Sequence, residues 1–422
     1  MTQDNTQQKK TGQELFNERN RRFMDAIAMK VPDRVPLFII ENYLPAKYAG
    51  LPKKVAHFNP PAWYAAFKKF LLDFMPDMQG EMIGVGLPGS AKAAEALGYV
   101  QHIYPGYGRD DNTAFQFIEA EYMKAEEYDH FIDDPTDFLL RVYLPRTHHS
   151  LAALGMLPPL KLLMMGAAAL SPLMLTPQFT GMLQALNAAA VEAANRAACQ
   201  AEFVEWTVEA GFPGICGGMT LAPFDWISDI LRGMRGSLLD IHRCPDKLMA
   251  AQEKILPWSI DLAIGAAKMS GNPRIFIPLH RGADGFMSIK QFETFYWPFL
   301  KKQILALVDA GLTPMPFFEG HYDQRLEHLR ELPAGKVLCW FDRTDMFRAK
   351  EVLGDKLCIA GGMLVSILEF GTIEQVKTLT RQLIEGPGKA GGFIMTANTV
   401  LDECDPVLVK TWIDATREYG KY

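Results

Sequence analysis

The sequence predicts an α/β fold, a TIM barrel in which eight parallel strands alternate with helices. Eight short apolar runs are rich in β-branched and aromatic residues, and runs that are apolar throughout are typical of a parallel sheet covered on both faces. A helix or a helix-rich segment follows each run, and several runs end at an ionisable residue. Eight such units are the number that closes a barrel. The runs span residues 35–40, roughly 77–85, 214–219, 274–279, 313–318, 337–341, 357–361 and 392–395.

A doubly wound open sheet is the main alternative to a closed barrel. The chain contains neither a GxGxxG nor a GxxxxGK[ST] pattern, so a nucleotide-binding sheet is not favoured. We therefore expect residues 1–422 to form a single barrel domain. A helical extension is predicted over residues 1–30, and an all-helical insertion rich in Ala, Met and Leu is predicted over residues 145–205.

In chain order, the N-terminal half is expected to be mostly helical around its first strands. A helix over Phe16–Ala28 leads to the first strand, which ends at Glu41. Ala91–Leu97 has helical composition. The predicted insertion ends in an Ala-rich amphipathic helix over 188–210, and Gly211 is a typical C-terminal stop.

The clearest unit of the C-terminal half lies between residues 273 and 320. A buried strand is followed by a polar turn, and Ser288 with Gln291 forms a capping-box pattern. The helix that follows has apolar residues at helical spacing and stops at Gly311, before a second apolar run that ends at Glu319. The remaining strands repeat this pattern, with helices expected over 344–353, 372–384 and 406–419.

Composition narrows the class of protein. With 422 residues, 49% of them hydrophobic, the chain is expected to be globular. A net charge of −6 and the lack of a basic stripe argue against a nucleic-acid partner. The six cysteines form no CxxC pair, which is typical of reduced thiols in a cytoplasmic protein. Prolines and a lysine interrupt the most apolar stretch, Leu157–Leu175, so no membrane span is expected.

Ionisable residues follow three consecutive predicted strands. His280 and Arg281 follow one strand, Glu319 and His321 the next, and Asp342 the third. Because the carboxyl ends of barrel strands meet at one rim, these residues are expected to share a single cavity. We predict catalytic roles for His280, Glu319, Asp342 and Arg281, since imidazole and carboxylate groups move protons or bind metals.

Further residues are expected to line the mouth of the barrel and contact the substrate. Several of them are aromatic, and aromatic linings are typical of sites for flat apolar ligands. The predicted substrate contacts are Glu41, Tyr43, Trp226, Phe317, Phe318, Trp340 and His321.

Eight segments, in order along the chain, resemble the uroporphyrinogen decarboxylase superfamily. Each segment is short, but their shared order is specific, and the resemblance implies a distorted TIM barrel. The segments are DRVPLF (Asp33–Phe38), AEALGY (Ala94–Tyr99), GGMTLAPFDWISDILRG (Gly217–Gly233), FMSIKQFETFYWPFLKK (Phe286–Lys302), AKEVLGD (Ala349–Asp355), GTIEQV (Gly371–Val376), GGFI (Gly391–Ile394) and EYG (Glu418–Gly420).

The superfamily contains two chemistries, and the first is cofactor-free decarboxylation of an acidic porphyrinogen. Those decarboxylases carry an Arg-rich RQAGRYLPEY segment that holds substrate carboxylates. The matching segment here is ENYLPAKY (Glu41–Tyr48), which keeps YLP but lacks both arginines and adds an acid. A substrate with many carboxylates would meet like charge in place of bidentate arginine partners, so this chemistry is not expected.

The second chemistry is methyl transfer by zinc enzymes that work with a corrinoid protein. The resemblance places the zinc ligands, His-x-Cys after the fifth strand and Cys after the last, at Phe317, Glu319 and about Thr399. The familiar triad is therefore missing. A rebuilt zinc site from His280, Glu319 and Cys404 is one expectation, because zinc accepts these ligand types; a site without metal is the other.

The resemblance implies a methyltransferase that moves a methyl group from a methoxylated or apolar small molecule to the corrinoid (cobalamin) of a partner carrier protein. Asp240-Ile241-His242 lacks the glycine of the corrinoid-binding DxHxxG pattern, so the cofactor would arrive on the partner. Two alternatives stay open. One is a lyase in which Arg281 holds a substrate carboxylate, and the other is a non-catalytic subunit that pairs with a homologous chain or with itself.

Overall fold

Six parallel strands and two short bridged segments form the barrel in the computed structural model, which describes residues 10–81 and 90–422. Six strands make one sheet in the order β4-β5-β6-β7-β8-β9. Parallel bridges Leu37–Met395, Phe38–Met78 and Gln79–Gly214 join its two edges through two short strands, so the ring is complete. The predicted TIM barrel is confirmed. The sheet strands are Gly218–Met219 (β4), Arg274–Leu279 (β5), Thr313–Phe318 (β6), Leu338–Phe341 (β7), Cys358–Met363 (β8) and Phe393–Ala397 (β9).

The strands are apolar because both of their faces are covered. Every residue of β5, β6 and β7 is buried. Successive side chains alternate between a core inside the barrel, which includes Phe276, Phe317 and Trp340, and a larger core between the barrel and its helices, which includes Ile277 and Phe318. This alternation decides which residues reach the barrel axis.

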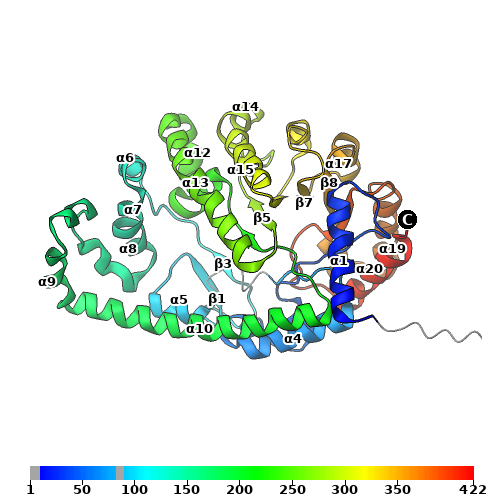
Figure 1. Cartoon of the computed structure of the whole chain (residues 1–422), viewed down its shortest axis with the longest axis horizontal. Coiled ribbons are helices and arrows are strands. Elements are labelled where there is room, and N and C mark those ends of the chain that lie inside the picture. The colour runs from blue at the N-terminus through cyan, green and yellow to red at the C-terminus, as the bar shows by residue number, and fades with distance from the viewer. Residues whose placement is uncertain (1–9, 82–89) are drawn as a thin grey trace, which may run out of the picture.

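Helices surround the ring (Figure 1). Thr11 and Glu14 form a capping box at the start of the first helix, and Ser288 with Gln291 forms the predicted one. The helices beside the strands are Gly12–Ile27 (α1), Leu44–Tyr48 (α2), Val55–Phe58 (α3), Pro60–Phe74 (α4), Pro223–Asp225 (α11), Gly233–Arg243 (α12), Pro245–Ser270 (α13), Ile289–Gln291 (α14), Trp297–Asp309 (α15), Leu326–Leu329 (α16), Met346–Leu353 (α17), Val365–Phe370 (α18), Ile373–Glu385 (α19) and Pro406–Tyr419 (α20).

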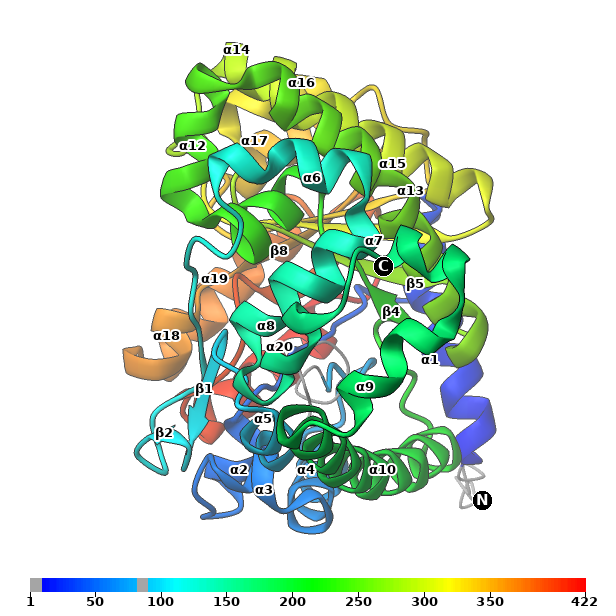
Figure 2. The same cartoon turned by 90° about the vertical axis from the view of Figure 1, so that its left-hand side faces the viewer.

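A long excursion separates the second strand from the third, and the predicted insertion, 145–205, lies within it. Figures 1 and 2 show its helices at one end of the molecule, with α10 running along one side. The excursion also contains a small sheet in the order β2-β1-β3, which the sequence analysis did not predict. Its elements are Ala91–Leu97 (α5), His102–Pro105 (β1), Gly108–Arg109 (β2), Gln116–Phe117 (β3), Tyr128–Asp133 (α6), Pro135–Phe138 (α7), Leu144–Thr147 (α8), Ser171–Met174 (α9) and Pro177–Ala210 (α10), with 3-10 turns over 149–156 and 160–170.

The end of the predicted second strand, beyond residue 81, lies outside the described residues. Within residues 10–81 and 90–422, no helix combines the length and the apolar character needed to cross a membrane.

Candidate active site at the carboxyl end of the barrel

Three predicted residues meet at the carboxyl ends of neighbouring strands. On β5, β6 and β7 the residues that face the barrel axis are Phe276, Phe317 and Trp340, and the two-residue repeat of a strand brings the same face to His280, Glu319 and Asp342. The Nε2 atom of His280 lies 3.5 Å from Oε1 of Glu319. The side chains of His280 and Glu319 are 30% and 39% exposed, so both remain open to a ligand.

His280 is held on its other side by a carboxylate that the sequence analysis missed. Its Nδ1 lies 2.5 Å from Oδ2 of Asp229, whose side chain is 5% exposed. An imidazole fixed through Nδ1 presents Nε2 in one orientation, which is how enzymes commonly orient a proton-transferring histidine. Asp229 therefore aims His280 at Glu319.

A second carboxylate that the sequence analysis missed, Asp225, holds the backbone of His280 and Arg281. Its Oδ2 accepts from the backbone N–H of His280 at 3.0 Å and from the Tyr296 hydroxyl at 2.6 Å, and its Oδ1 accepts from the N–H of Arg281 at 3.2 Å. Asp225 ends α11, and Asp229 lies in the π-helical turn Trp226–Arg232 that follows. Acids spaced by four residues on a helix share one face, and that spacing after the third strand was the signal that could have identified them.

Arg281 is an internal partner of these acids rather than an open anion site. Its side chain is 8% exposed. The guanidinium donates to Ser228 Oγ at 2.7 Å, pairs with Asp229 at 3.1 Å and hydrogen-bonds Glu119 from the excursion. These contacts use its Nε and Nη2 donors within the protein.

Asp342 supports the loop that carries Glu319. Its Oδ2 accepts from the backbone N–H of Gly320 at 3.0 Å, and its Oδ1 accepts from the Asn398 side chain at 2.9 Å. Gly320 has φ +84, a left-handed conformation that favours glycine. The FFEG sequence thus lets the chain turn directly after Glu319 while Asp342 fixes the turn.

The electrostatics of the cluster favour a protonated imidazole. Burial acts to lower the pKa of His280, but hydrogen bonds and charge from Asp229 and Glu319 outweigh it, so the pKa lies well above its usual range. Burial and the nearby charge of Asp229 raise the pKa of Asp225. His280 therefore keeps its proton to a higher pH than an ordinary imidazole does.

Below this pair, the barrel is filled by aromatic rings. Phe317 stacks on Trp340 with ring centroids 4.0 Å apart, and Phe276 stacks on Phe317 at 6.2 Å. Phe317 and Trp340 are 5% and 1% exposed, so they form a floor under the mouth, and the Trp340 indole donates to the carbonyl of Ala397. These rings fill the barrel beneath His280 and Glu319 and are themselves almost fully buried.

Other predicted contacts lie away from the mouth. Phe318 points outward and packs on Tyr322 and Phe341, because a strand alternates its faces. Tyr43 is fully buried and hydrogen-bonds His57 at 2.6 Å. His321 has a side chain that is 61% exposed and faces Asp323 at 3.5 Å. These placements correct the prediction that all of them line the mouth.

Glu41 lies at the end of the first strand and is fully buried. Its Oε2 accepts from the backbone N–H of Gly80 at 2.9 Å, and its Oε1 has no hydrogen-bond partner among residues 10–81 and 90–422. Burial raises the pKa of Glu41 well above its usual range. Since the side chain is enclosed, the structure gives it no exposed face toward a substrate.

The predicted zinc ligands are not assembled. No group of three or more His, Cys, Asp or Glu side chains in the described part of the chain is arranged to hold a metal ion. Cys404 is 0% exposed within the outer apolar core, and burial raises the pKa of its thiol to about 12. Because Cys404 lies in the outer core and not beside His280 and Glu319, the set His280, Glu319 and Cys404 does not fit zinc.

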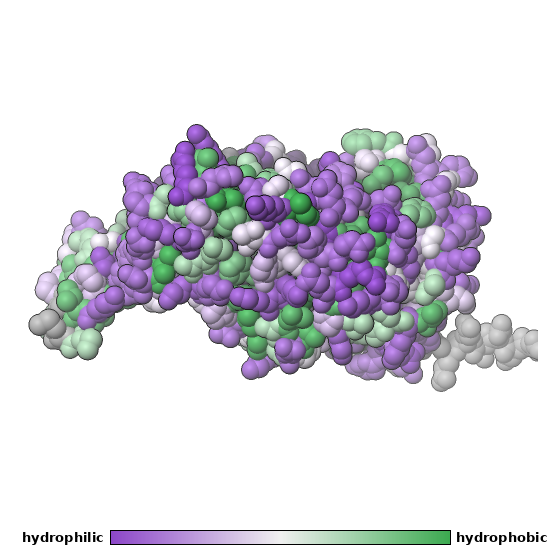
Figure 3. All heavy atoms as spheres, turned by 90° about the horizontal axis from the view of Figure 1, so that it is seen from above, coloured by the Kyte–Doolittle hydropathy of each residue, from purple (hydrophilic) through white to green (hydrophobic). Residues whose placement is uncertain are grey.

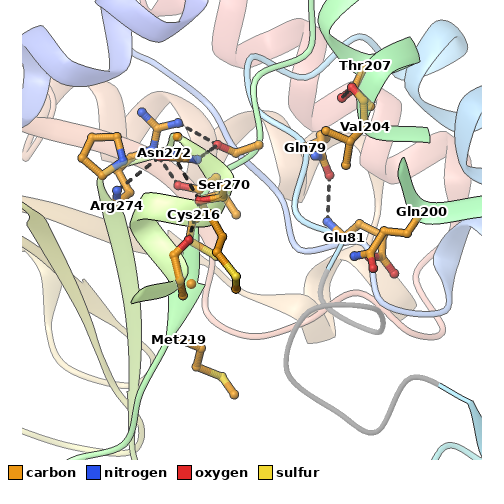
Figure 4. A pocket seen from close by; sticks show the side chains of 18 of the residues that line it. Gln79, Glu81, Gln200, Val204, Thr207, Cys216, Met219, Ser270, Asn272 and Arg274 are labelled. Carbon is orange, nitrogen blue, oxygen red and sulfur yellow. Dashed lines mark hydrogen bonds between the residues drawn. The ribbon is translucent and has the colours of Figure 1, made fainter. Parts of the chain in front are cut away.

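A separate cavity of about 880 Å³ lies on the flank of the barrel, between α1, α10 and α13. Figure 4 shows Gln79, Glu81, Gln200 and Val204 on one side and Cys216, Asn272 and Arg274 on the other. Trp226, a predicted substrate contact, lines this cavity, whereas His280, Glu319 and Asp342 are not among its lining residues.

Comparisons with known proteins agree with this architecture. The model of the uroporphyrinogen decarboxylase (URO-D) family matches residues 176–419. A zebrafish (Danio rerio) uroporphyrinogen decarboxylase is 22% identical over 215 residues, which are 48% of this chain and 57% of that protein, so the match spans little more than half the relative's length. The solved structure of a methyltransferase from Methanosarcina mazei superposes with a TM-score of 0.57 at 15% identity, covering 95% of this chain and 98% of the other.

The closed ring of parallel strands, with ionisable groups at their carboxyl ends, defines the chain as a TIM-barrel protein with its candidate site at the usual end of the barrel. The family match covers more than half of the chain. The chain belongs to the uroporphyrinogen decarboxylase family.

Proposed function

We propose that this protein is a methyltransferase that moves a methyl group from an apolar, methoxylated small molecule to the corrinoid of a partner carrier protein. The observation that carries the proposal is the Asp229–His280–Glu319 array above an aromatic floor. The oxygen of an aryl ether would bind beside His280 and Glu319, whose side chains are the exposed part of this array. The solved methyltransferase that shares this barrel over nearly the whole chain supports the same class of chemistry.

The task of this chain is to supply a proton to the leaving oxygen. An ether oxygen leaves poorly unless it is protonated while the bond to the methyl carbon breaks. His280 carries the proton on Nε2, and Asp229 stabilises the imidazolium through Nδ1. The proton leaves with the alcohol product, and Glu319, which is 39% exposed, orients the N–H and can relay a new proton from water to His280. Catalysis by such a positioned acid is worth about 10²–10⁴-fold.

The methyl acceptor would be supplied by the partner. When bound at the mouth, a cobalt(I) corrinoid supplies the nucleophile that receives the methyl group. Within residues 10–81 and 90–422, the nearest match to a corrinoid motif is already occupied by the protein, since its Asp240 is 1% exposed and accepts from Arg232 at 2.6 Å and Tyr128 at 2.9 Å. The zinc set described above does not fit either, so no step is assigned to a metal.

Decarboxylation is the second candidate, and family membership is what favours it. The site argues against it. Arg281, the cation nearest to His280, is already paired with Asp229 and Glu119, and Glu41 stands where the decarboxylases carry an arginine-rich segment. A substrate with several carboxylates would meet acids that already use the local positive charge.

The test incubates the purified protein with free cob(I)alamin and a panel of aryl methyl ethers, and follows the absorbance of cob(I)alamin. We expect its loss with at least one ether, and we expect His280→Gln to slow it by about 10²-fold or more. The matched control is His321→Gln. His321 is an exposed histidine that follows the neighbouring strand β6, and its substitution should leave the rate of cob(I)alamin loss unchanged. Carbon dioxide release from a carboxylated substrate without cob(I)alamin would favour a lyase, and no turnover with either would favour a non-catalytic subunit.

A further inference from the structure

The cavity on the flank of the barrel has the size of a small-molecule site. Its volume of about 880 Å³ lies within the range of roughly 300–1,000 Å³ that is usual for ligand pockets. It lies beside the bridge that joins the second strand to the third at Gln79 and Gly214. Neither His280 nor Glu319 is among its lining residues, so a ligand here would not occupy the site assigned to methyl transfer.

One wall of this cavity holds a buried cation that no carboxylate neutralises. Arg274, the first residue of β5, is 3% exposed. Among the residues that the structure describes, no Asp or Glu side chain forms an ion pair with it, and the thiol of Cys216 is the one group whose charge would favour its charged form. Burial therefore lowers the pKa of Arg274 to about 10. A buried charge of this kind is stabilised when an opposite charge comes to it.

The other charged residue that lines the cavity, Glu81, is compensated. Its Oε1 accepts from the Trp63 indole at 3.2 Å and lies 4.0 Å from Nη2 of Arg196. Figure 4 shows Glu81 across the cavity from Arg274. Since the charge of Glu81 has a cation beside it and the charge of Arg274 has no acid beside it, the cavity favours an anion at the Arg274 end.

Arg274 also keeps a donor for such an anion. A guanidinium has five N–H groups, and four contacts within the protein are made by this one. Nε donates to Ile215 at 2.7 Å, Nη1 to Asn20 at 2.7 Å and to Met24 at 3.7 Å, and Nη2 to Gly214 at 2.7 Å. One N–H of Nη2 remains. Because the Asn20 oxygen accepts from Arg274, the amide nitrogen of Asn20, which also lines the cavity, is a second donor.

The rest of the cavity suits an apolar body. Its rim between α10 and α13 carries four exposed apolar residues, Val204, Val208, Leu262 and Met269, which are 49%, 36%, 50% and 87% exposed. Over much of the face in Figure 3, by contrast, apolar residues are set among hydrophilic ones. Clustered exposed apolar residues beside a cavity are typical of a ligand-binding groove, and methionine adapts to apolar ligands of different shapes.

We propose that the flank cavity binds an amphiphilic monocarboxylate, whose carboxylate pairs with Arg274 and whose apolar body lies between α10 and α13. The single unmatched positive charge selects one anionic group, and the apolar rim selects a hydrocarbon body over a polar one. This binding is independent of the methyl transfer proposed above, because the two sites share neither His280 nor Glu319.

The first experiment titrates the full chain at pH 7 with octanoate and with octan-1-ol, which has the same chain length and no charge, in a calorimeter. We expect one octanoate per chain, bound about 10-fold or more tighter than octan-1-ol, as a hydrogen-bonded charge implies. Arg274→Gln removes the charge and should abolish this preference. Circular dichroism checks that the variant folds.

A pair of surface variants tests the rim without altering the buried arginine. Val204→Glu places a like charge at the opening and should weaken octanoate binding by about fivefold. The matched control is Ala197→Glu, an exposed position two turns earlier on α10 that does not line the cavity, and it should bind octanoate like the wild type. Equal binding by the two variants, equal affinities of the wild type for octanoate and octan-1-ol, or no saturable octanoate binding would each overturn the proposal.

The last experiment locates the ligand. Cys216 lines the cavity and Cys244 does not, and both thiols are partly exposed. Each is followed by mass spectrometry during alkylation with N-ethylmaleimide. Octanoate at ten times its Kd should slow modification of Cys216 by about 10-fold and leave Cys244 unchanged. A Cys216 rate that octanoate does not alter would place the ligand elsewhere and refute the assignment.

Discussion

Asp229 sets both the orientation and the charge of His280. Burial opposes the charged imidazole, and the contacts to Asp229 and Glu319 raise its pKa well above the usual range. Asp229→Asn keeps the shape and removes the charge, so the pKa of His280 should fall. The acid form is present below that pKa and lost as pH rises through it, so the basic limb of the kcat–pH profile should move to lower pH, with kcat reduced by about 10²-fold or more.

Imidazole NMR of the same variant gives a readout that does not need the substrate. The His280 titration should shift to lower pH in Asp229→Asn, and should stay in place in Asp323→Asn, which alters only the exposed partner of His321. An unchanged His280 titration in Asp229→Asn would refute the positioning role.

Glu41 is predicted to make the protein less stable as pH rises. Its carboxyl is fully buried, and burial raises its pKa well above the ordinary value. The folded state therefore keeps a proton that the unfolded chain loses above about pH 4.3. Stability is complete below that value and is lost as pH rises through the folded pKa, at up to about 1.4 kcal/mol per pH unit.

Glu41→Gln stays neutral and should remove this pH dependence. Urea unfolding at pH 5 and pH 8 measures the free energy of unfolding of both proteins. The variant should gain stability relative to the wild type at the higher pH. Glu403→Gln is the control, because the side chain of Glu403 is 54% exposed and its pKa is lowered by hydrogen bonds to Lys53. Parallel stability–pH curves for Glu41→Gln and the wild type would contradict the prediction.

At the residue scale, the sequence was informative where strand periodicity applies. His280, Glu319 and Asp342 could be placed at one rim because each follows a buried strand. Asp225 and Asp229 were missed, since their role depends on how the turn after the third strand packs against the end of β5. Cys404 was assigned to the site by position after β9, but the loop carries its thiol into the outer core.

At the scale of elements, Asp77 ties α1 to the first two barrel strands. It is 1% exposed. It accepts from Arg22 at 3.0 Å, from Arg34 at 2.8 Å and from the backbone N–H of Leu37 at 2.9 Å. Burial acts to raise the pKa of Asp77, and the two arginines more than offset this, so the pKa is lowered. This stabilisation is present above about pH 3.9 and is lost as pH falls through the folded pKa.

Asp77→Asn should lower the free energy of unfolding by about 3–5 kcal/mol, because it leaves buried cations without their counter-charge. Asp33→Asn removes an exposed partner of the same Arg22, with a side chain that is 61% exposed, and should cost about 1 kcal/mol or less. Urea unfolding at pH 7 compares the free energies of unfolding of the two variants with that of the wild type. Equal losses would show that the buried junction does not anchor α1.

Elements with long apolar runs were predictable, and those held by a few bonds were not. β5 and β6 are six residues each and have the bounds that the sequence predicted. The small sheet has strands of two to four residues, too short for a period-2 pattern to register. The first two barrel strands are joined to the ring by single bridges. Their apolar runs could be recognised in the sequence, but the strands with which they pair could not.

At the scale of the whole molecule, the end of the excursion formed by residues 149–182 should unfold independently of the barrel. It has its own small core of Leu151, Ala153, Phe179 and Met182, separate from the two cores of the barrel. Regions with few buried apolar contacts open with lower free energies than the global value. Amides of residues 149–170 should therefore exchange hydrogen faster than those of β5 to β9.

Hydrogen exchange by mass spectrometry resolves the two regions in one experiment. Equal protection of residues 149–170 and of β5 to β9 would mean that this end of the molecule does not open separately from the barrel.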